Sequence, residues 1–491
     1  MSARSDLGTL EASGLIQIAA LQPELEYLFR HALVQEAAYA SLLKQDRRAL
    51  HLAAAEAILA LHPEREREYA GVLAMHFELS GDVARACRFL LMAGQQALER
   101  FANREAISFY ARAGDLAGDE LPDVRLQAAI GGAKAGWAYN AAGADIERLE
   151  RALTAADQAD PALVAEAYFW IAFLRRQRGE SPENSPEMKQ ALERGAQLGK
   201  SLGDQNAAVV PKALMGAFMA FTGELRDGAR EMREALDFIE AKGDPVSTAM
   251  VSDFLAFAYS RLGEFAAAES TIARAARLAR GGDDIARVDV DISRATLALE
   301  RGDVEEACDQ ARECSARAED LGAFACVVAS NAMFGAACLA RDDAPGAKAP
   351  LERGNELSLV TNMAPMRTLL QGFLGSARAR MGDMPGGVAG WEHALASARK
   401  MSDRYGEAQT LWGRGQTYAR NGEWATALPD LERAAELFEA MEARPAQARA
   451  LHDLAETLTA LGRAGDAVAF SRRSQEIARE LGLKDLAIPQ S

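Results

Sequence analysis

The stretch Leu262-Gly263-Glu264 returns at regular intervals along the chain, each time with glycine at its centre. The later copies are Arg301-Gly302-Asp303, Met381-Gly382-Asp383, Asn421-Gly422-Glu423 and Leu461-Gly462-Arg463. Asp342 takes the place of the glycine in Arg341-Asp342-Asp343, and with it the spacing is 39 residues once and 40 thereafter. A fixed period of this length is typical of solenoids built from repeated helical hairpins. We therefore predict an all-α fold.

Small residues recur at three fixed places around these turns. One lies seven residues before the turn, one five after it and one twelve after it; around Gly382 they are Gly375, Gly387 and Ala394, and the turn at Gly223 has the same pattern. Small side chains at these places allow two antiparallel helices to approach closely. The turn glycine accepts the left-handed backbone that ends a helix, and an acidic residue after it favours the start of the next helix.

This pattern resembles the tetratricopeptide repeat, which has the same small-residue spacing around its turn. Two features differ: the period is about 40 residues instead of 34, and the proline that commonly ends the second helix is missing. A longer second helix and connection accommodate the extra residues. The pattern also fits the turn at Gly81, whereas it is weaker at Gly143 and Gly179. The resemblance implies a right-handed superhelix of tetratricopeptide-like hairpins.

The first sixty residues differ from the repeats. Residues 15–18 and 25–29 flank Gln22-Pro23, which predicts a small β-hairpin, and helices follow from about Arg30. The segment from Phe29 to Leu43, followed by Arg47-Arg48-Ala49-Leu50-His51, resembles the junction before the repeats in large STAND-type ATPases. That family includes multidomain adenylate or guanylate cyclases and MalT-like regulators. The resemblance implies that the hairpin is the wing of a truncated winged helix.

These observations divide the chain into four parts. We expect a truncated winged-helix and junction segment at 1–60, N-terminal tetratricopeptide-like hairpins at 61–200, regular 40-residue repeats at 201–485, and a tail at 486–491. No P-loop, Walker B strand or cyclase domain accompanies the junction, so the ATPase or cyclase activity of the similar family does not carry over.

The composition of the chain limits the cellular environment and the binding partners that we expect for this protein. A formal charge of −16 over 491 residues opposes nucleic-acid binding, because neutralising phosphates requires a basic surface. The sequence contains neither a signal peptide nor an apolar run long enough to span a bilayer. The five cysteines form no Cys-x-x-Cys pair, so we expect them to be reduced and buried. We predict a cytoplasmic protein, and the excess of arginine over lysine together with the alanine content indicates a bacterial source.

Sequence motifs for catalysis are weak. Residues 195–201, Gly-Ala-Gln-Leu-Gly-Lys-Ser, end like a phosphate-binding loop, but the spacing is one residue short and the preceding pattern is helical. The six histidines form no metal-binding pair at helical spacing. Asp289 and Asp291 are two apart on a predicted helix, so their side chains diverge by about 200°. We therefore expect no enzymatic activity, cofactor or metal.

A repeat superhelix does provide a concave surface lined by the first helix of each hairpin. Arg261, Arg380 and Arg420 each stand two residues before a turn, and Trp412 and Gln416 lie near the same lining. These residues suit an acidic peptide or a C-terminal carboxylate, although arginines near helix ends are also ordinary surface charges.

We therefore predict a non-catalytic protein-binding scaffold. The alternatives are the sensor portion of a split or truncated STAND ATPase or adenylate cyclase, with that enzyme as the partner, and a MalT-like transcription regulator without its DNA-binding domain. Neither nucleic acid nor a membrane is an expected partner.

Overall fold

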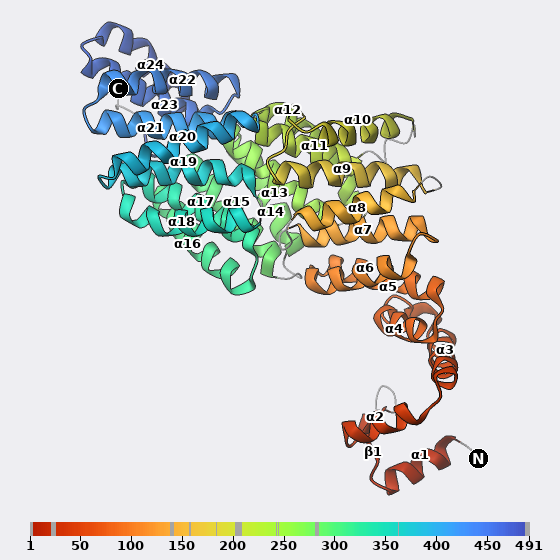
Figure 1. Cartoon of the computed structure of the whole chain (residues 1–491). Coiled ribbons are helices and arrows are strands. Elements are labelled where there is room, and N and C mark those ends of the chain that lie inside the picture. The colour runs from red at the N-terminus through yellow and green to blue at the C-terminus, as the bar shows by residue number, and fades with distance from the viewer. Residues whose placement is uncertain are drawn as a thin grey trace. The chain divides into compact units, whose positions relative to one another are not determined.

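A computed structural model describes residues 3–20, 26–137, 142–156, 159–182, 184–201, 209–241, 243, 245–279, 284–361 and 363–486. The chain divides into two compact units, Met1–Ala93 and Gly94–Ser491. Over the described residues the regular elements are α-helices, apart from one β-hairpin and one short 3-10 helix (Figure 1). The all-α prediction is confirmed. In the same residues, no helix combines the length and apolarity needed to cross a membrane.

The first unit contains the predicted β-hairpin. Ile16 pairs with Phe29 and Gln17 with Leu28 in antiparallel register, and the residues that connect the strands lie outside the described ranges. The assignment of this hairpin to a winged helix remains a prediction. The elements are α1 (Ala3–Ala12), β1 (Ile16–Ala20), β2 (Glu26–Phe29), α2 (Ala32–Ser41), α3 (Lys44–Leu61), η1 (Pro63–Arg65), α4 (Ala70–Ser80) and α5 (Val83–Glu99), which runs into the second unit.

The second unit is a stack of helical hairpins. Its helices are α6 (Asn103–Ala117), α7 (Pro122–Gly136), α8 (Ala142–Thr154), α9 (Pro161–Gln177), α10 (Pro186–Ser201), α11 (Val209–Thr222), α12 (Leu225–Ala241), α13 (Pro245–Leu262), α14 (Phe265–Ala279), α15 (Asp284–Arg301), α16 (Val304–Leu321), α17 (Phe324–Ala340), α18 (Ala344–Val360), α19 (Ala364–Arg380), α20 (Met384–Lys400), α21 (Arg404–Arg420), α22 (Trp424–Ala440), α23 (Arg444–Ala460) and α24 (Ala464–Leu481). Within each regular hairpin from α11 to α24, the odd-numbered helix is the first and the even-numbered helix is the second.

The predicted turns join the two helices of these hairpins. The turn glycines have φ between 76° and 96°, and Asp342 adopts the same left-handed conformation with φ of 62°. A left-handed residue reverses the chain at the helix end, and glycine does so without a steric penalty. Gly143 is an exception to the prediction, because it lies in the first turn of α8 and not between helices.

The small residues lie where the two helices of a hairpin are closest. A Cβ atom added to Gly375 would lie 2.9 Å from the carbonyl oxygen of Gly387. One added to Gly228 would lie 2.8 Å from the backbone nitrogen of Ala220. Backbones in such close contact leave no room for a side chain, which explains the spacing found in the sequence.

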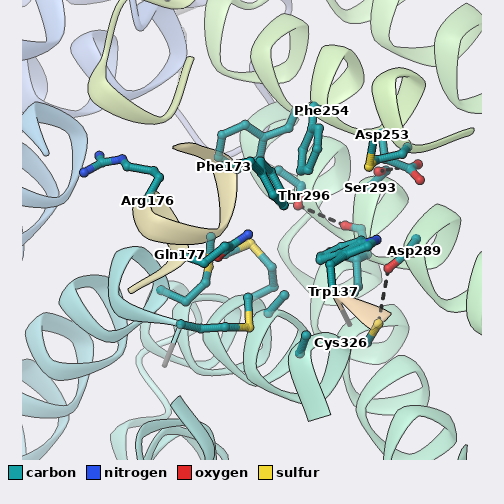
Figure 2. Close-up of a pocket in the computed structure, with 18 residues that line it drawn as sticks. Trp137, Phe173, Arg176, Gln177, Asp253, Phe254, Asp289, Ser293, Thr296 and Cys326 are labelled. Carbon is teal, nitrogen blue, oxygen red and sulfur yellow. Dashed lines mark hydrogen bonds between the residues drawn. The ribbon is translucent and has the colours of Figure 1, made fainter. Parts of the chain in front are cut away.

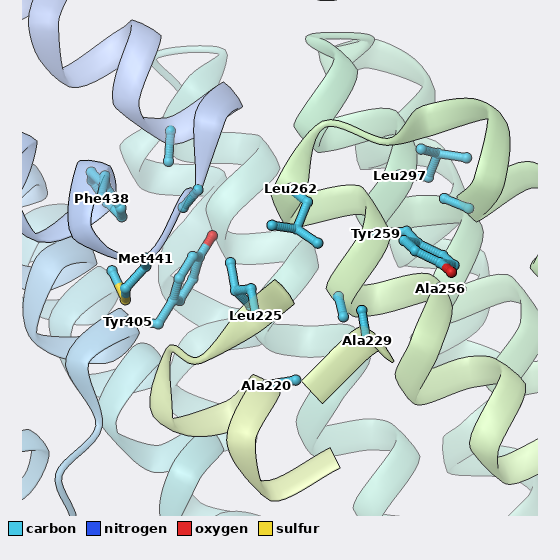
Figure 3. Close-up of a cluster of buried hydrophobic side chains, with 14 of the residues drawn as sticks. Ala220, Leu225, Ala229, Ala256, Tyr259, Leu262, Leu297, Tyr405, Phe438 and Met441 are labelled. Carbon is cyan, nitrogen blue, oxygen red and sulfur yellow. The ribbon is translucent and has the colours of Figure 1, made fainter. Parts of the chain in front are cut away.

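The period did not predict that later hairpins pack back against earlier ones. Helix α9 contacts α19, α11 contacts α21, and α13 contacts α23. Figure 3 shows Leu225 and Leu262 of the earlier hairpins near Tyr405 and Met441 of the later ones, within one buried cluster. The hairpins therefore form a superhelix whose successive turns touch, and its inner helices enclose space.

Candidate binding cavity on the inner helices

The five residues that the sequence singled out for binding lie around one cavity of about 350 Å³. Arg261 belongs to α13, Arg380 to α19, and Trp412, Gln416 and Arg420 to α21. Most of the other lining residues come from first helices too, namely α15, α17 and α23. The structure therefore brings together side chains that are up to 159 residues apart in the sequence.

Arg261 is almost completely buried, with 4% of its surface exposed. Its guanidinium carbon lies 3.6 Å from the ring centroid of Phe257 and 3.3 Å from that of Tyr405, so the cation is stacked between two rings. Among the described residues it makes no hydrogen bond or ion pair, and its buried Nε has no acceptor. Burial lowers the pKa of Arg261, although Tyr405, Glu300 and Asp403 oppose this effect.

Arg380 is also buried, with 8% of its side chain exposed. It donates from Nη1 to the carbonyl oxygen of Leu339 at 2.9 Å and from Nη2 to Oε1 of Gln416 at 3.1 Å, whereas its Nε has no acceptor. Oδ1 of Asp342 lies 3.9 Å from Nη1 and ion-pairs with the more exposed Arg420. Burial and the neighbouring Arg420 lower the pKa of Arg380 to about 10. Its positive charge is therefore only weakly compensated.

Trp412 and Gln416 hold a half-buried carboxylate, that of Asp453, which the sequence pattern did not predict. Nε1 of Trp412 and Nε2 of Gln416 donate to the same oxygen of Asp453, at 2.6 and 2.8 Å. Burial raises the pKa of Asp453, and these two hydrogen bonds oppose the rise. Since Gln416 also accepts from Arg380, its amide bridges a cation and an anion across the cavity.

A second network links distant hairpins on the same cavity. Tyr405 donates its hydroxyl to Glu300 at 3.0 Å and accepts from Nε2 of Gln409 at 2.9 Å. Arg449 lies 3.7 Å from Glu300 and donates to Asp485 with N–O distances of 2.5 and 3.1 Å. Burial raises the pKa of Glu300, against the opposing effects of Arg449 and Arg261. These carboxylates are thus already partnered, unlike the guanidinium of Arg261.

One residue of these networks, Glu300, was predictable from its position in the repeat. Glu300 stands two residues before Gly302, at the position that Arg261 occupies before Gly263. Extending the rule for that position from arginine to every charged residue would have selected Glu300. No repeat position predicts its pairing with Tyr405, because the hydroxyl donor lies 105 residues further on.

The structure places both of the weak catalytic motifs of the sequence on helices. Residues 195–201 lie in α10, so their backbone amides are engaged in a helix and do not wrap a phosphate. Asp289 and Asp291 diverge as predicted: Asp291 pairs with Arg294 and Arg317 outside, while Asp289 lines a separate inner cavity.

Two histidines of the first unit do meet, which their sequence spacing did not predict. Nδ1 of His51 lies 2.9 Å from Nδ1 of His76, and the hydroxyl of Tyr39 lies 2.9 Å from Nε2 of His51. Across the described residues, no group of three or more His, Cys, Asp or Glu side chains is placed to hold a metal ion. The two imidazole rings, with centroids 5.1 Å apart, form a contact between α3 and α4.

Comparison with known proteins agrees with the repeat assignment at the C-terminal end. Residues 406–480, from α21 to α24, match the tetratricopeptide repeat family. A search of curated protein sequences gives no match.

Several solved structures resemble the chain. A Rap protein complexed with competence and sporulation factor is 13% identical, with a TM-score of 0.48 over 81% of this chain and 98% of that one. The apo form of the quorum sensor NprR from B. thuringiensis is 13% identical, with a TM-score of 0.43 over 70% and 97%. A Rap conjugation gene regulator of the plasmid pLS20, in complex with the Phr* peptide, is 11% identical, with a TM-score of 0.48 over 71% and 94%. The class of protein that the fold and the repeat define is an all-α helical-repeat protein, in which residues 406–480 match the tetratricopeptide repeat.

Proposed function

We propose that this chain is a non-catalytic scaffold that binds an acidic segment of a partner protein in the cavity lined by Arg261 and Arg380. The observation that carries the proposal is the charge imbalance of these two side chains. Both are more than nine-tenths buried, both retain a buried Nε without an acceptor, and neither has a carboxylate at hydrogen-bonding distance among the described residues. A cytoplasmic location is part of the same proposal.

The chemistry of the guanidinium group favours a carboxylate ligand. Burying a cation without a counter-ion is costly, whereas a guanidinium that meets a carboxylate forms charge-assisted and often bidentate hydrogen bonds. The acidic residues of the cavity already have partners of their own, since Glu300 accepts from Tyr405 and Asp453 accepts from Trp412 and Gln416. An incoming carboxylate therefore competes with few groups for the arginines. Arg420 is about half exposed, so it is suited to attract a carboxylate at the entrance of this cavity.

Fluorescence anisotropy with a defined probe tests the proposal. The probe is a fluorescein-labelled Ser-Glu-Leu-Asp-Leu peptide with a free carboxyl terminus, and its control is the Ser-Gln-Leu-Asn-Leu amide. We expect saturable binding of the acidic peptide and about 10- to 100-fold weaker binding by Arg380→Met, because one charge-assisted hydrogen bond contributes about 1.5–3 kcal/mol.

Arg433→Gln is the matched control variant. Arg433 lies on the second helix α22, is 56% exposed, and pairs only on the surface with Glu436. Its replacement should leave the affinity unchanged. Equal affinity for the acidic peptide and the amide control, or equal loss in both variants, would refute the proposal.

A second candidate function is the regulatory arm of a separate ATPase or cyclase subunit. The observation that favours it is apolar exposure in the first unit: Leu33 is 78% and Leu43 73% exposed, and α2 contains no buried residue. A photo-crosslinking residue at position 33 or 43 should capture a P-loop ATPase or cyclase in cells. Crosslinks no different from those at Val468 of α24, which is 65% exposed, would exclude this candidate. No observation favours the MalT-like alternative.

A further inference from the structure

A second cavity of about 120 Å³, hereafter the apolar cavity, adjoins the arginine cavity that Arg261 and Arg380 line. Thr296 and Met333 line both cavities, so the two spaces share part of their walls. Phe257 is a further link, because it lines the apolar cavity while the guanidinium carbon of Arg261 lies 3.6 Å from its ring centroid. One short segment can therefore reach both cavities at once.

Aromatic and aliphatic side chains form most of the wall of the apolar cavity (Figure 2). Phe173 and Phe254 have ring centroids 6.1 Å apart, and Trp137 lies 6.2 Å from the first and 6.4 Å from the second. Several methionines and Ile292 complete this part of the lining, and methionine side chains adapt to the shape of a ligand. Such a wall favours an occupant that removes its own apolar surface from water.

The size of the apolar cavity suits a single side chain. A cavity of about 150 Å³ lined by leucine, isoleucine and phenylalanine binds benzene. The apolar cavity, at about 120 Å³, is slightly smaller and has adaptable methionines in its wall. It therefore accommodates a side chain of the size of leucine, methionine or phenylalanine.

Two carboxylates on the wall are hydrogen-bonded within the protein. Asp253 accepts from the hydroxyl of Ser293 at 3.2 Å, and Asp289 accepts from the thiol of Cys326 at 3.3 Å. An apolar side chain has no hydrogen-bond donor, so it does not compete for these carboxylates and both bonds remain when it enters. An apolar occupant is therefore compatible with the polar part of the wall.

We propose that the apolar cavity binds a bulky apolar side chain of the same partner segment whose carboxylate meets Arg261 and Arg380. The inference rests on the proposed function, which supplies the carboxylate, and it adds a second recognition element. The partner's motif is then a leucine, methionine or phenylalanine beside an acidic residue, or at the C-terminus, where one residue carries both groups. Burial of the side chain adds affinity, and the arginines orient the segment.

Fluorescence anisotropy with fluorescein-labelled peptides tests the inference. Ser-Glu-Leu-Asp-Leu is compared with Ser-Glu-Ala-Asp-Ala, which carries the same charges and lacks the bulky side chains. We expect the alanine peptide to bind at least about tenfold more weakly, because it buries much less apolar surface. Ser-Glu-Ala-Asp-Leu and Ser-Glu-Leu-Asp-Ala then identify the leucine that enters the cavity, since only one of them should lose the affinity.

Variants of the cavity wall distinguish this site from other apolar contacts. Ala329 of α17 lines the apolar cavity, so Ala329→Phe should fill it and weaken the leucine peptide at least about tenfold without changing the alanine peptide. Ala316→Phe is the matched control, because Ala316 is exposed on the second helix α16, and it should change neither affinity. Circular dichroism establishes that each variant folds.

Met366→Ala tests the inference by removing a side chain from the wall, and it does not depend on the folding of Ala329→Phe. It should reduce the ratio of the two peptide affinities by about threefold or more, because the leucine side chain loses contacts that the alanine peptide does not make. An unchanged ratio would contradict the inference.

The outcomes separate this inference from the proposed function. Equal affinity for the leucine and alanine peptides, with binding still weakened by Arg380→Met, would overturn the inference and leave the proposed function in place. Equal weakening of both peptides by Ala329→Phe would also overturn it. If the amide Ser-Gln-Leu-Asn-Leu binds as tightly as Ser-Glu-Leu-Asp-Leu, and Arg380→Met weakens neither, the proposed function fails and the combined motif fails with it.

Discussion

The turn at Gly302 contacts residues 484–485, and this contact closes the superhelix. Its contribution to stability can be measured by adding one methyl group at Gly302. This turn residue has φ of 85°, and a Cβ there would lie 2.7 Å from the backbone nitrogen of Asp485. Gly422 is a matched control, because its φ is 78° but a Cβ there meets nothing within 4 Å. Alanine at either place carries the cost of a left-handed backbone, about 1–2 kcal/mol. Only Gly302→Ala adds a steric conflict, which for overpacked sites costs about 1–3 kcal/mol.

The conflict at position 302 also acts on hydrogen bonds that close the cavity. The backbone nitrogen of Lys484 donates to the carbonyl oxygen of Arg301 at 3.0 Å, and Asp485 accepts from Arg449. Moving this segment away to accommodate a methyl group would break both interactions. The total destabilisation should then be about 2–5 kcal/mol for Gly302→Ala and about 1–2 kcal/mol for Gly422→Ala.

Urea unfolding followed by circular dichroism measures the free energy of unfolding of the Gly302→Ala and Gly422→Ala variants. Hydrogen exchange with mass spectrometry adds local information, because the amide of Lys484 should lose protection in Gly302→Ala and keep it in Gly422→Ala. Equal destabilisation by the two substitutions, together with unchanged exchange at Lys484, would show that the superhelix does not close through this contact.

Three further predictions concern other parts of the chain. Ser402 has φ of 54°, a left-handed backbone that glycine adopts at lower cost, so Ser402→Gly should raise the free energy of urea unfolding by about 0.5–1 kcal/mol. A lower free energy of unfolding in this variant would mean that the backbone is not strained there. Burial and His51 lower the pKa of His76, so the folded state favours its neutral form, and the stability this contributes is lost as the pH falls below about 6.5. The protection factors of the amides in α3 and α4, which are corrected for the intrinsic pH dependence of exchange, should therefore fall on acidification more in the wild type than in His76→Gln. An equal fall in both proteins would contradict this. The five cysteines are buried, and burial raises the pKa of Cys338 to about 12 and that of Cys326 well above its usual range. Ellman's reagent at pH about 8 should therefore react slowly with the native chain and fully with the chain in denaturant. Rapid reaction of the native chain would refute that burial.

Local rules predicted most of the helical architecture. The spacing of Gly263, Gly302 and Gly382 predicted left-handed turns, and Asp342 adopts that conformation where the sequence departs from glycine. The small residues at Gly375 and its counterparts marked the close approach of two helices. These predictions succeed because hairpin geometry depends on residues within about twenty positions of each other.

The candidate site was only partly predictable. Repeat position indicated that Arg261 and Arg380 face inward, since first helices line the concave surface of such a stack. It did not indicate that these two arginines are buried while Arg420 remains half exposed. Burial here depends on how far the superhelix winds before its hairpins meet again.

The sequence by itself thus determined the repeat, its turns and the inner face of each first helix, because these follow from spacing along one chain. Only the tertiary structure decided which inner residues share a cavity. Small rotations between neighbouring hairpins accumulate along the stack and bring α13 against α23. That closure places Tyr405 beside Glu300 and stacks it on Arg261, although no local spacing relates them. The chemistry of both cavities results from this long-range packing.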